Sequence, residues 1–157
     1  MRHRNDVNTG DFIVSKRLRL ADVKRFPEML LADYERRLKA LQNNLQMIQQ
    51  AYLGTSERAV VVLEGWDTAG KGGVVRRLAW AFDPRSFKVH PISAPSLREQ
   101  AQHYLQRFWE RLPHRGEIVV FDLSWYGRVL VERVEQLATA SEWKRAYREI
   151  NELNARS

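Results

Sequence analysis

Apolar residues recur at every third or fourth position between residues 30 and 52, with polar residues between them. This spacing predicts one long amphipathic helix that begins near Glu28, stops at Gly54 and buries a single stripe. A run of about three heptads is short for a coiled coil, so we expect the stripe to pack against a sheet rather than against a partner helix. The stripe consists of Leu30, Leu31, Tyr34, Leu38, Leu41, Leu45, Ile48 and Tyr52.

Downstream of residue 58, short apolar runs alternate with helical patterns. Ala59–Leu63 is an unbroken apolar run rich in β-branched residues, typical of a central parallel strand covered on both faces. Two further strands are predicted at residues 87–92 and 117–121. The alternation predicts an α/β fold with a parallel sheet, incomplete because such sheets usually have about four to six strands. Helices are predicted at residues 74–82, 96–112, 129–137 and 139–153.

Two of these helices carry a start signal. Ser96 and Glu99 form a capping box, in which the hydroxyl and the carboxylate each satisfy a backbone N–H group. Thr139 and Glu142 repeat that spacing before the last helix. Residues 1–27 show no sustained period and are predicted to form an irregular arm, so residues 28–157 constitute the expected core domain.

The chain is basic, with 26 Lys and Arg residues against 19 Asp and Glu residues and a net charge of +7. Such a surface attracts polyanions, which include nucleic acid, phosphorylated metabolites, polyphosphate and anionic membranes. Nucleic acid is the less favoured partner, because the basic residues are mixed with acidic ones along the predicted helices and no known reader motif is present.

Cysteine is absent from the sequence, which excludes disulfides, thiolate zinc sites and thiol nucleophiles. No apolar stretch approaches the ~20 residues of a membrane span, and residues 1–6 lack the apolar run of a secretory signal. We therefore expect a cytoplasmic protein without a membrane partner. An incomplete sheet and aromatic-rich helices would leave apolar surface exposed, so we also expect a homo-oligomer.

Residues 65–71 match the G-x-x-x-x-G-K part of the Walker A pattern, between a predicted strand and a predicted helix. Glycines let the backbone wrap around a phosphate, several N–H groups point inward, and the helix N-terminus adds partial positive charge. The alternative is a tight strand-to-helix turn with a surface lysine. We predict that phosphate is bound by Gly65, Gly70, Lys71, Gly72 and Gly73, with the Lys71 charge on the transferring group.

Position 72 departs from the Walker A pattern, because glycine replaces the Ser or Thr that holds magnesium. Asp67, inside the loop, is a candidate metal ligand, since a carboxylate among phosphate-seeking donors is costly unless it binds a cation or a proton-bearing group. Asp122, at the end of an apolar strand, has the position of a Walker B carboxylate. The alternatives are a turn-stabilising role for Asp67 and a helix cap for Asp122.

Two arginines follow Asp122 and complete the list of candidates. Arg128 is predicted to begin a helix close to the phosphates, where a guanidinium grips two oxygens at once and neutralises developing charge. Arg133 either assists it or pairs with Glu132 or another acid. The predicted catalytic residues are therefore Asp67, Lys71, Asp122 and Arg128, and Arg128 and Arg133 join the phosphate-binding set.

Taken together, these segments resemble the polyphosphate kinase 2 family of P-loop kinases. The resemblance runs from about Tyr34 to Leu153, and its most specific mark is the Gly72-Gly73 variant. One departure is Leu123, where the family usually has an arginine that adds a phosphate-facing charge. The matching segments are residues 64–73 (EGWDTAGKGG), 83–85 (DPR), 103–109 (HYLQRFW) and 121–134 (FDLSWYGRVLVERV).

The resemblance implies a thymidylate-kinase-like fold that uses Mg²⁺ and inorganic polyphosphate to phosphorylate nucleoside mono- or diphosphates such as AMP, ADP or GDP, or runs the reverse reaction. The loop aspartate and lysine are required in that family, which assigns those roles to Asp67 and Lys71, and the strand-end aspartate, here Asp122, is assigned to metal. Family members continue past residue 157 through another core strand and a lid. A chain truncated before the lid is expected to be slow or inactive.

Two other function classes remain open from the sequence. One is a non-catalytic module that binds polyphosphate or a nucleotide through the same loop but lacks the lid. The other is nucleic-acid binding by the basic surface, which predicts a steep salt dependence of DNA affinity and no competition by polyphosphate.

Overall fold

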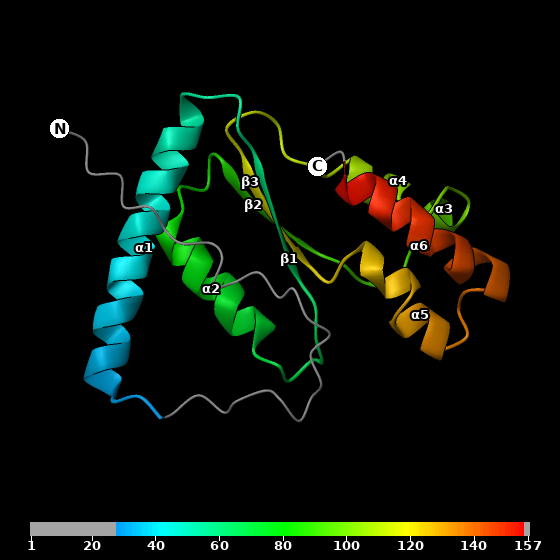
Figure 1. The fold of residues 1–157 in the computed structure, drawn as a ribbon, viewed down its shortest axis with the longest axis horizontal. Helices are drawn as coiled ribbons and strands as arrows, with labels where there is room; N and C mark the ends of the chain where they lie inside the picture. Colours follow the sequence, from blue (N-terminus) through cyan, green and yellow to red (C-terminus); the bar gives the residue numbers. More distant parts are fainter. Residues whose placement is uncertain (1–27, 156–157) are drawn as a thin grey trace.

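A computed structural model describes residues 28–155. The predicted arm, residues 1–27, lies outside this range. Figure 1 shows a sheet with helices on both sides: α1 and α2 lie on one side, and α3, α4 and α6 lie on the other. The elements are α1 Leu31–Leu53, β1 Ala59–Leu63, α2 Lys71–Ala81, β2 Phe87–Pro91, α3 Leu97–Gln100, α4 Gln106–Trp109, β3 Ile118–Asp122, the 3-10 helix η3 Trp125–Arg128, α5 Val131–Val134 and α6 Ala140–Asn154.

The sheet has 3 strands, all parallel, in the order β1-β3-β2. The predicted α/β class and parallel sheet are therefore confirmed. The prediction that Ala59–Leu63 is the central strand is wrong, because β3 pairs with both neighbours and β1 lies at an edge. An apolar run indicates that both faces of a strand are covered, but it does not indicate whether the strand has a hydrogen-bonded neighbour on one edge or on both.

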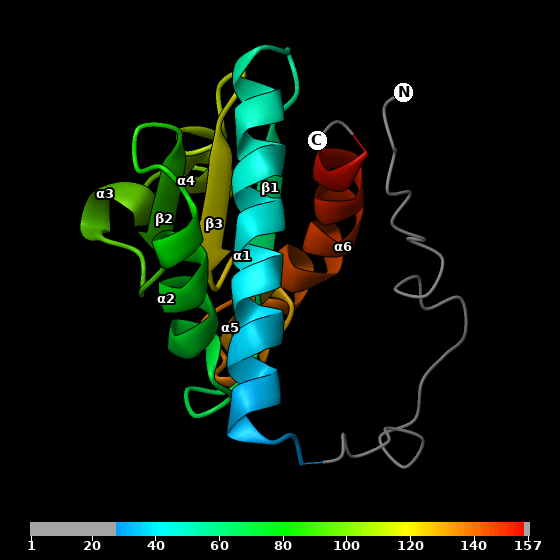
Figure 2. The ribbon, with the colours of Figure 1, turned by 90° about the vertical axis from the view of Figure 1, so that its left-hand side faces the viewer.

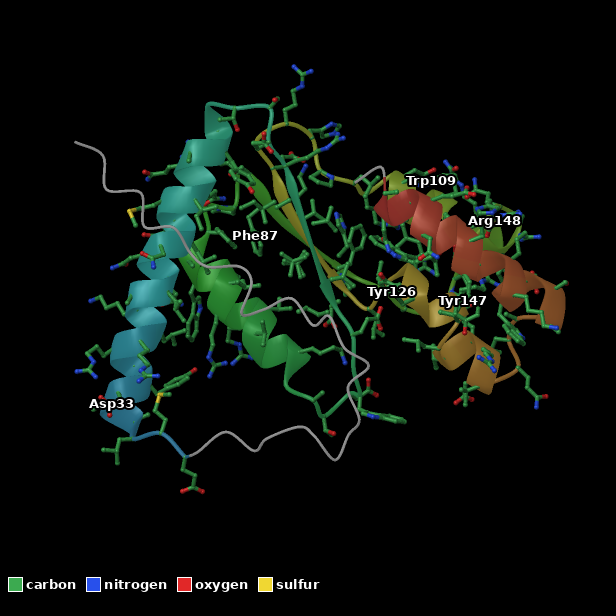
Figure 3. All side chains as sticks on the ribbon, in the orientation of Figure 1. Asp33, Phe87, Trp109, Tyr126, Tyr147 and Arg148 are labelled. Carbon is green, nitrogen blue, oxygen red and sulfur yellow. The ribbon has the colours of Figure 1, made fainter. Side chains whose placement is uncertain are left out.

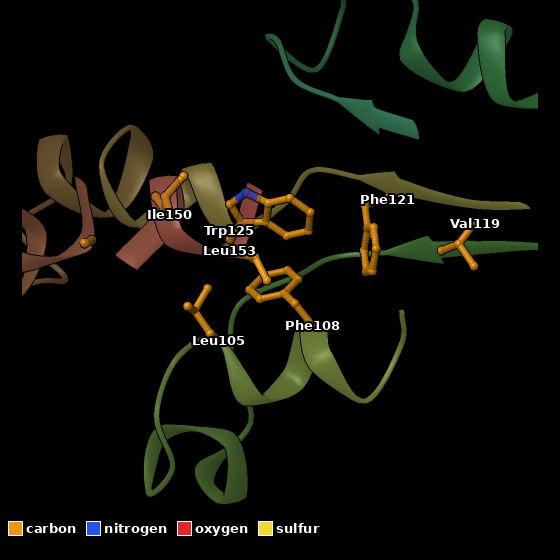
Figure 4. Packing of buried hydrophobic residues seen from close by; sticks show 8 residues of the cluster. Leu105, Phe108, Val119, Phe121, Trp125, Ile150 and Leu153 are labelled. Carbon is orange, nitrogen blue, oxygen red and sulfur yellow. The ribbon is translucent and has the colours of Figure 1, made fainter. Parts of the chain in front are cut away.

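Alternation along β3 sends its side chains into two separate cores. Val119 and Phe121 point to one face and join Phe108, Trp125 and Ile150 from α4, η3 and α6 (Figure 4). Ile118 and Val120 point to the other face, where α1 and α2 lie side by side (Figure 2), and pack with Phe82 and Phe87. Val119, Val120 and Phe121 are fully buried, as expected for the middle strand of a three-layer fold.

The long helix α1 is fixed to the sheet layer by a buried glutamine. Gln49 accepts a hydrogen bond from the backbone N–H of Asp83 at 2.7 Å, and it donates to the Asp83 carbonyl at 2.9 Å and to Ser86 Oγ at 2.8 Å. Both ends of the amide are therefore satisfied, which a buried polar group requires. The prediction of a fully buried apolar stripe is wrong in part, because Leu31, Leu41 and Ile48 are exposed. Gln49, which is not in that stripe, is the residue that ties α1 to the turn between α2 and β2.

Two predicted helices are shorter than expected. The capping box of Ser96 and Glu99 is confirmed, but α3 ends at Gln100 and a separate turn, α4, begins at Gln106, so the predicted helix 96–112 is wrong. The predicted helix 129–137 is also wrong, because only the four-residue α5 forms there, after the separate 3-10 helix η3, and Val134 is exposed. Leu105 and Phe108 are buried against α6, and their burial decides the path of the chain between α3 and α4.

The last helix, α6, agrees with its prediction. Thr139 and Glu142 form the expected capping box, and Ala146, Ile150 and Leu153 are buried. Between residues 28 and 155, no helix is long and apolar enough to span a bilayer.

Candidate functional site

The candidate site lies at the carboxyl edge of the sheet, between β1 and β3. Leu63 pairs with Asp122 in the register of these two strands, so both strands end side by side. From this edge the chain leaves β1 toward α2 on one face and leaves β3 toward η3 and α5 on the other (Figure 1). Adjacent strands whose connections depart to opposite faces create the crevice in which open α/β sheets bind their ligands.

The glycine-rich loop joins the end of β1 to the start of α2 at this edge. Gly70, its last residue, has φ 87°, a left-handed conformation that favours glycine, and the N-terminus of α2 receives no side-chain cap. The first N–H groups of a helix lack intrahelical acceptors. An uncapped N-terminus of this kind attracts an anion through its N–H groups and the helix dipole.

The side chain of Lys71 folds back over the loop. Its Nζ donates to the carbonyl oxygens of Gly65 at 2.8 Å and Trp66 at 3.0 Å. The Trp66 carbonyl also accepts a hydrogen bond from the N–H of Ala69 at 2.9 Å, which closes a turn within the loop. The ammonium group therefore stands beside the loop backbone, and no carboxylate among residues 28–155 forms an ion pair with it.

The two candidate metal ligands differ in their surroundings. Asp122 ends β3, and its Oδ1 atom is buried without a hydrogen-bond partner. Asp67 lies on the exposed loop. Within residues 28–155, no three His, Asp or Glu side chains gather closely enough to hold a metal ion by themselves. A buried carboxylate oxygen without a donor fits a cation such as Mg²⁺, which binds through one or two carboxylates and completes its shell with water and phosphate oxygens.

Arg128 is held on the α6 side of the site. Its Nε lies 3.2 Å from Glu132 Oε2, its Nη1 lies 3.9 Å from Glu142 Oε1, and the guanidinium stacks over the ring of Tyr104 at 4.6 Å. Burial, together with the nearby Glu149 carboxylate, raises the pKa of Tyr104, so the ring stays neutral beneath the cation. Two carboxylates and an aromatic face thus surround the guanidinium charge, although its buried Nε makes no hydrogen bond.

Arg133 also turns toward α6. It donates from Nη1 to the hydroxyl of Tyr147 at 3.2 Å and stacks over the ring of Trp143 at 4.2 Å. Figure 3 shows Tyr147 on the side of α6 that faces α5. The structure therefore brings together the glycine loop, Lys71 and Asp122 along one edge of the sheet, and it holds Arg128 and Arg133 against α6.

Sequence reasoning missed a contact that joins the two turns of the site. Ser124 Oγ donates to Glu64 Oε1 at 2.6 Å, across 60 positions of sequence. Glu64 precedes the first glycine of the loop, and Ser124 follows Asp122 by two positions. Both lie in segments that resemble the polyphosphate kinase 2 family, and this resemblance is the signal in the sequence that points to them.

Comparisons with known proteins identify the family. Residues 29–156 match the family described as Polyphosphate kinase 2 (PPK2). The polyphosphate:AMP phosphotransferase of Pseudomonas syringae pv. tomato is 52% identical over 120 residues, which cover 76% of this chain and 24% of that protein. The ADP-polyphosphate phosphotransferase 2 of Rhizobium meliloti is 42% identical over 126 residues, covering 80% of this chain and 41% of that protein.

A solved structure extends the likeness to three dimensions. The crystal structure of polyphosphate kinase 2 from Arthrobacter aurescens TC1 matches with a TM-score of 0.83 and 32% identity, over 91% of this chain and 54% of that one. The chain spans less than half the length of the two enzymes named above, between 24% and 41%. The family model nevertheless covers most of the chain, and the fold superposes on that structure: the chain belongs to the polyphosphate kinase 2 family.

Proposed function

We propose that this chain carries the phosphate- and metal-binding half of a kinase that moves phosphoryl groups between inorganic polyphosphate and a nucleoside mono- or diphosphate. The observation that carries the proposal is the juxtaposition of the uncapped N-terminus of α2 and Lys71 with the buried, unpartnered Oδ1 of Asp122 on the neighbouring strand. Relatives named for transfer to AMP and to ADP support this substrate class.

In this proposal the backbone amides of the loop and of the first turn of α2, between Gly65 and Gly73, surround a phosphate, and Lys71 places its ammonium group on the phosphoryl group that moves. Lys71 can turn from the carbonyl oxygens of Gly65 and Trp66, because those bonds are exposed to solvent. Phosphoryl transfer depends mainly on positioning and on neutralising charge at the transferred group. The loop and its lysine supply both.

Asp122, with Asp67 from the loop, would hold Mg²⁺, whose role when bound is to neutralise phosphate oxygens and orient them for in-line transfer. Arg128 and Arg133 remain proposed phosphate contacts. Arg128 reaches a phosphate only by leaving Glu132 and Glu142, and the same change of position frees its guanidinium for two oxygens.

A second candidate function is a non-catalytic module that binds polyphosphate or nucleotide. It is favoured by the positions of Arg128 and Arg133, which lie against carboxylates and aromatic rings and leave Lys71 as the loop's own cation. In this reading the chain binds the anion without transferring it.

A steady-state assay separates the two functions. The chain is incubated with long-chain polyphosphate, Mg²⁺ and either ADP or AMP, and the phosphorylated nucleotide is measured. Turnover that disappears in Lys71→Ala supports the kinase. Binding of polyphosphate without turnover supports the module, and absence of both would refute the proposed function.

Assembly is part of the same proposal. Leu31, Leu41 and Ile48 of α1 are exposed, which leaves an apolar strip on the outer layer. We propose that this strip takes part in a homo-oligomer. Light scattering of the chain and of Leu41→Glu tests it, with a fall to monomer mass as the expected result.

A further inference from the structure

The two turns of the site are tied to each other only weakly by their backbones. The last backbone bond between them runs from the N–H of Leu123 to the Leu63 carbonyl at 2.9 Å. Leu123 has φ 65°, a left-handed conformation unfavourable for a residue with a branched side chain. Beyond this point the chain on one side enters the glycine loop and on the other enters η3, so a further contact is needed to fix their spacing.

That contact is the hydrogen bond between Ser124 and Glu64. Ser124 is 4% exposed, and its hydroxyl donates to Glu64 Oε1 at 2.6 Å while it accepts from the N–H of Tyr126 at 3.3 Å. The serine hydroxyl is therefore fixed by one bond that it donates and one that it accepts. A short bond to a charged acceptor is among the stronger hydrogen bonds in proteins.

We infer that Glu64 and Ser124 are positioning residues, which hold the Asp122 carboxylate at a fixed separation from the glycine loop. Asp122 stands between the backbone bond at Leu123 and the pairing of β3 with β1, two positions before Ser124. Metal and phosphate sites lose affinity when the residues that orient their ligands are removed. This inference rests on the proposed function for the identity of the ligand, a divalent cation bound together with phosphate.

The test measures metal binding instead of turnover. Mn²⁺ serves as the probe in the presence of tripolyphosphate, and free Mn²⁺ is followed by electron paramagnetic resonance for the unaltered chain and for Ser124→Ala, Glu64→Ala and Glu64→Gln. We expect the two alanine variants to raise the Kd for Mn²⁺ by about tenfold or more. Glu64→Gln keeps an acceptor for the serine hydroxyl, so it is expected to recover most of the affinity.

The double variant Glu64→Ala/Ser124→Ala is expected to bind Mn²⁺ no more weakly than either single variant, because both remove the same bond. Thr139→Ala is the matched control. It removes a hydroxyl-to-carboxylate bond of similar length, 2.7 Å from Thr139 Oγ1 to Glu142 Oε2, at the start of α6. Its Mn²⁺ affinity is expected to equal that of the unaltered chain.

Three results would overturn the inference: unchanged Mn²⁺ affinity in folded Glu64→Ala, equal losses in Glu64→Gln and Glu64→Ala, or no Mn²⁺ binding by the unaltered chain. Equal losses of Mn²⁺ affinity in Glu64→Gln and Glu64→Ala would show that Glu64 binds the metal through its negative charge and does not act by holding Ser124. Thermal unfolding identifies any variant that fails to fold. If Ser124→Ala fails to fold, Glu64→Ala still tests the inference, because Glu64 is exposed. Nucleotide phosphorylation by the unaltered chain is measured separately. If the variants bind Mn²⁺ as expected but the unaltered chain transfers no phosphoryl group, the proposed kinase function is refuted and the positioning role is retained.

Discussion

The Nζ atom of Lys71 lies 2.8 Å from the carbonyl oxygen of Gly65, the residue that opens the glycine loop. The bond closes the loop on itself and holds the ammonium group over the edge of the sheet at which Asp122 ends β3. An anion that enters the loop therefore meets the lysine already in place, and the ammonium group exchanges neutral carbonyl acceptors for a charged one. A bond from the ammonium group to an anionic phosphate oxygen joins opposite charges and is stronger than its bonds to neutral carbonyl oxygens, so this exchange favours binding.

Replacing Lys71 with Met is expected to weaken tripolyphosphate binding by about 10- to 100-fold, the effect of losing a hydrogen bond to a charged group. Isothermal titration calorimetry measures the change. Lys88→Met is the matched control, since it removes the same charge from a residue that pairs with Glu117 near the start of β2. Equal losses in both variants would show that binding depends on net charge and not on the loop.

The two glycines Gly70 and Gly72 are expected to respond to alanine with opposite signs. A Cβ meets nothing within 4 Å at either position, so crowding plays no part. Gly70 has φ 87°, and Gly70→Ala is expected to destabilise the fold by about 1–2 kcal/mol. Gly72 lies inside α2, and Gly72→Ala is expected to stabilise by about 0.5 kcal/mol. Urea denaturation measures both, and stabilisation by Gly70→Ala would contradict the left-handed conformation.

Removing the Arg128 side chain is expected to lower the free energy of unfolding by about 1–2 kcal/mol, because Glu132 and Glu142 lose a partly buried partner. Chemical denaturation of Arg128→Ala measures the loss. For comparison, Arg145→Ala breaks the more exposed pair with Glu149 and is expected to cost less than about 0.5 kcal/mol. Unchanged stability in Arg128→Ala would mean that the guanidinium does not occupy this position in solution.

The acid side of the stability profile has one contributor that can be followed directly. Hydrogen bonds from the Arg85 side chain and backbone lower the pKa of Asp83 from 3.8 to about 2. Because the folded pKa is depressed, the stabilisation is complete above pH 3.8 and is lost as the pH falls toward 2. Carbon NMR titration of the carboxyl group is expected to show this value, and Arg85→Ala to return it toward 3.8.

Arg148→Ala removes an arginine that pairs with Glu152 on α6 and is expected to leave the pKa of Asp83 unaltered. A value for Asp83 near 3.8 in the unaltered chain would show that its pairing with Arg85 is absent in solution.

Interactions between close neighbours in the sequence determined several features of this protein. The strand Ala59–Leu63, the capping boxes at Ser96 and Thr139, and the left-handed glycine before α2 all depend on residues within a few positions of one another. Such local interactions act at almost the same strength in any fold, so they can be predicted from the sequence. The glycine loop and the parallel α/β class follow from the same signals.

Contacts between distant residues decided the rest. Pairing on both edges made β3 the central strand, and burial of Phe108 against Phe121 and Trp125 set the path between α3 and α4. Contacts with Glu142 and with the ring of Tyr104 hold Arg128 on the α6 side. The bond between Ser124 and Glu64 spans 60 positions. Only the tertiary structure decides these features, because partners far apart in the chain meet at a geometry that no sequence period encodes.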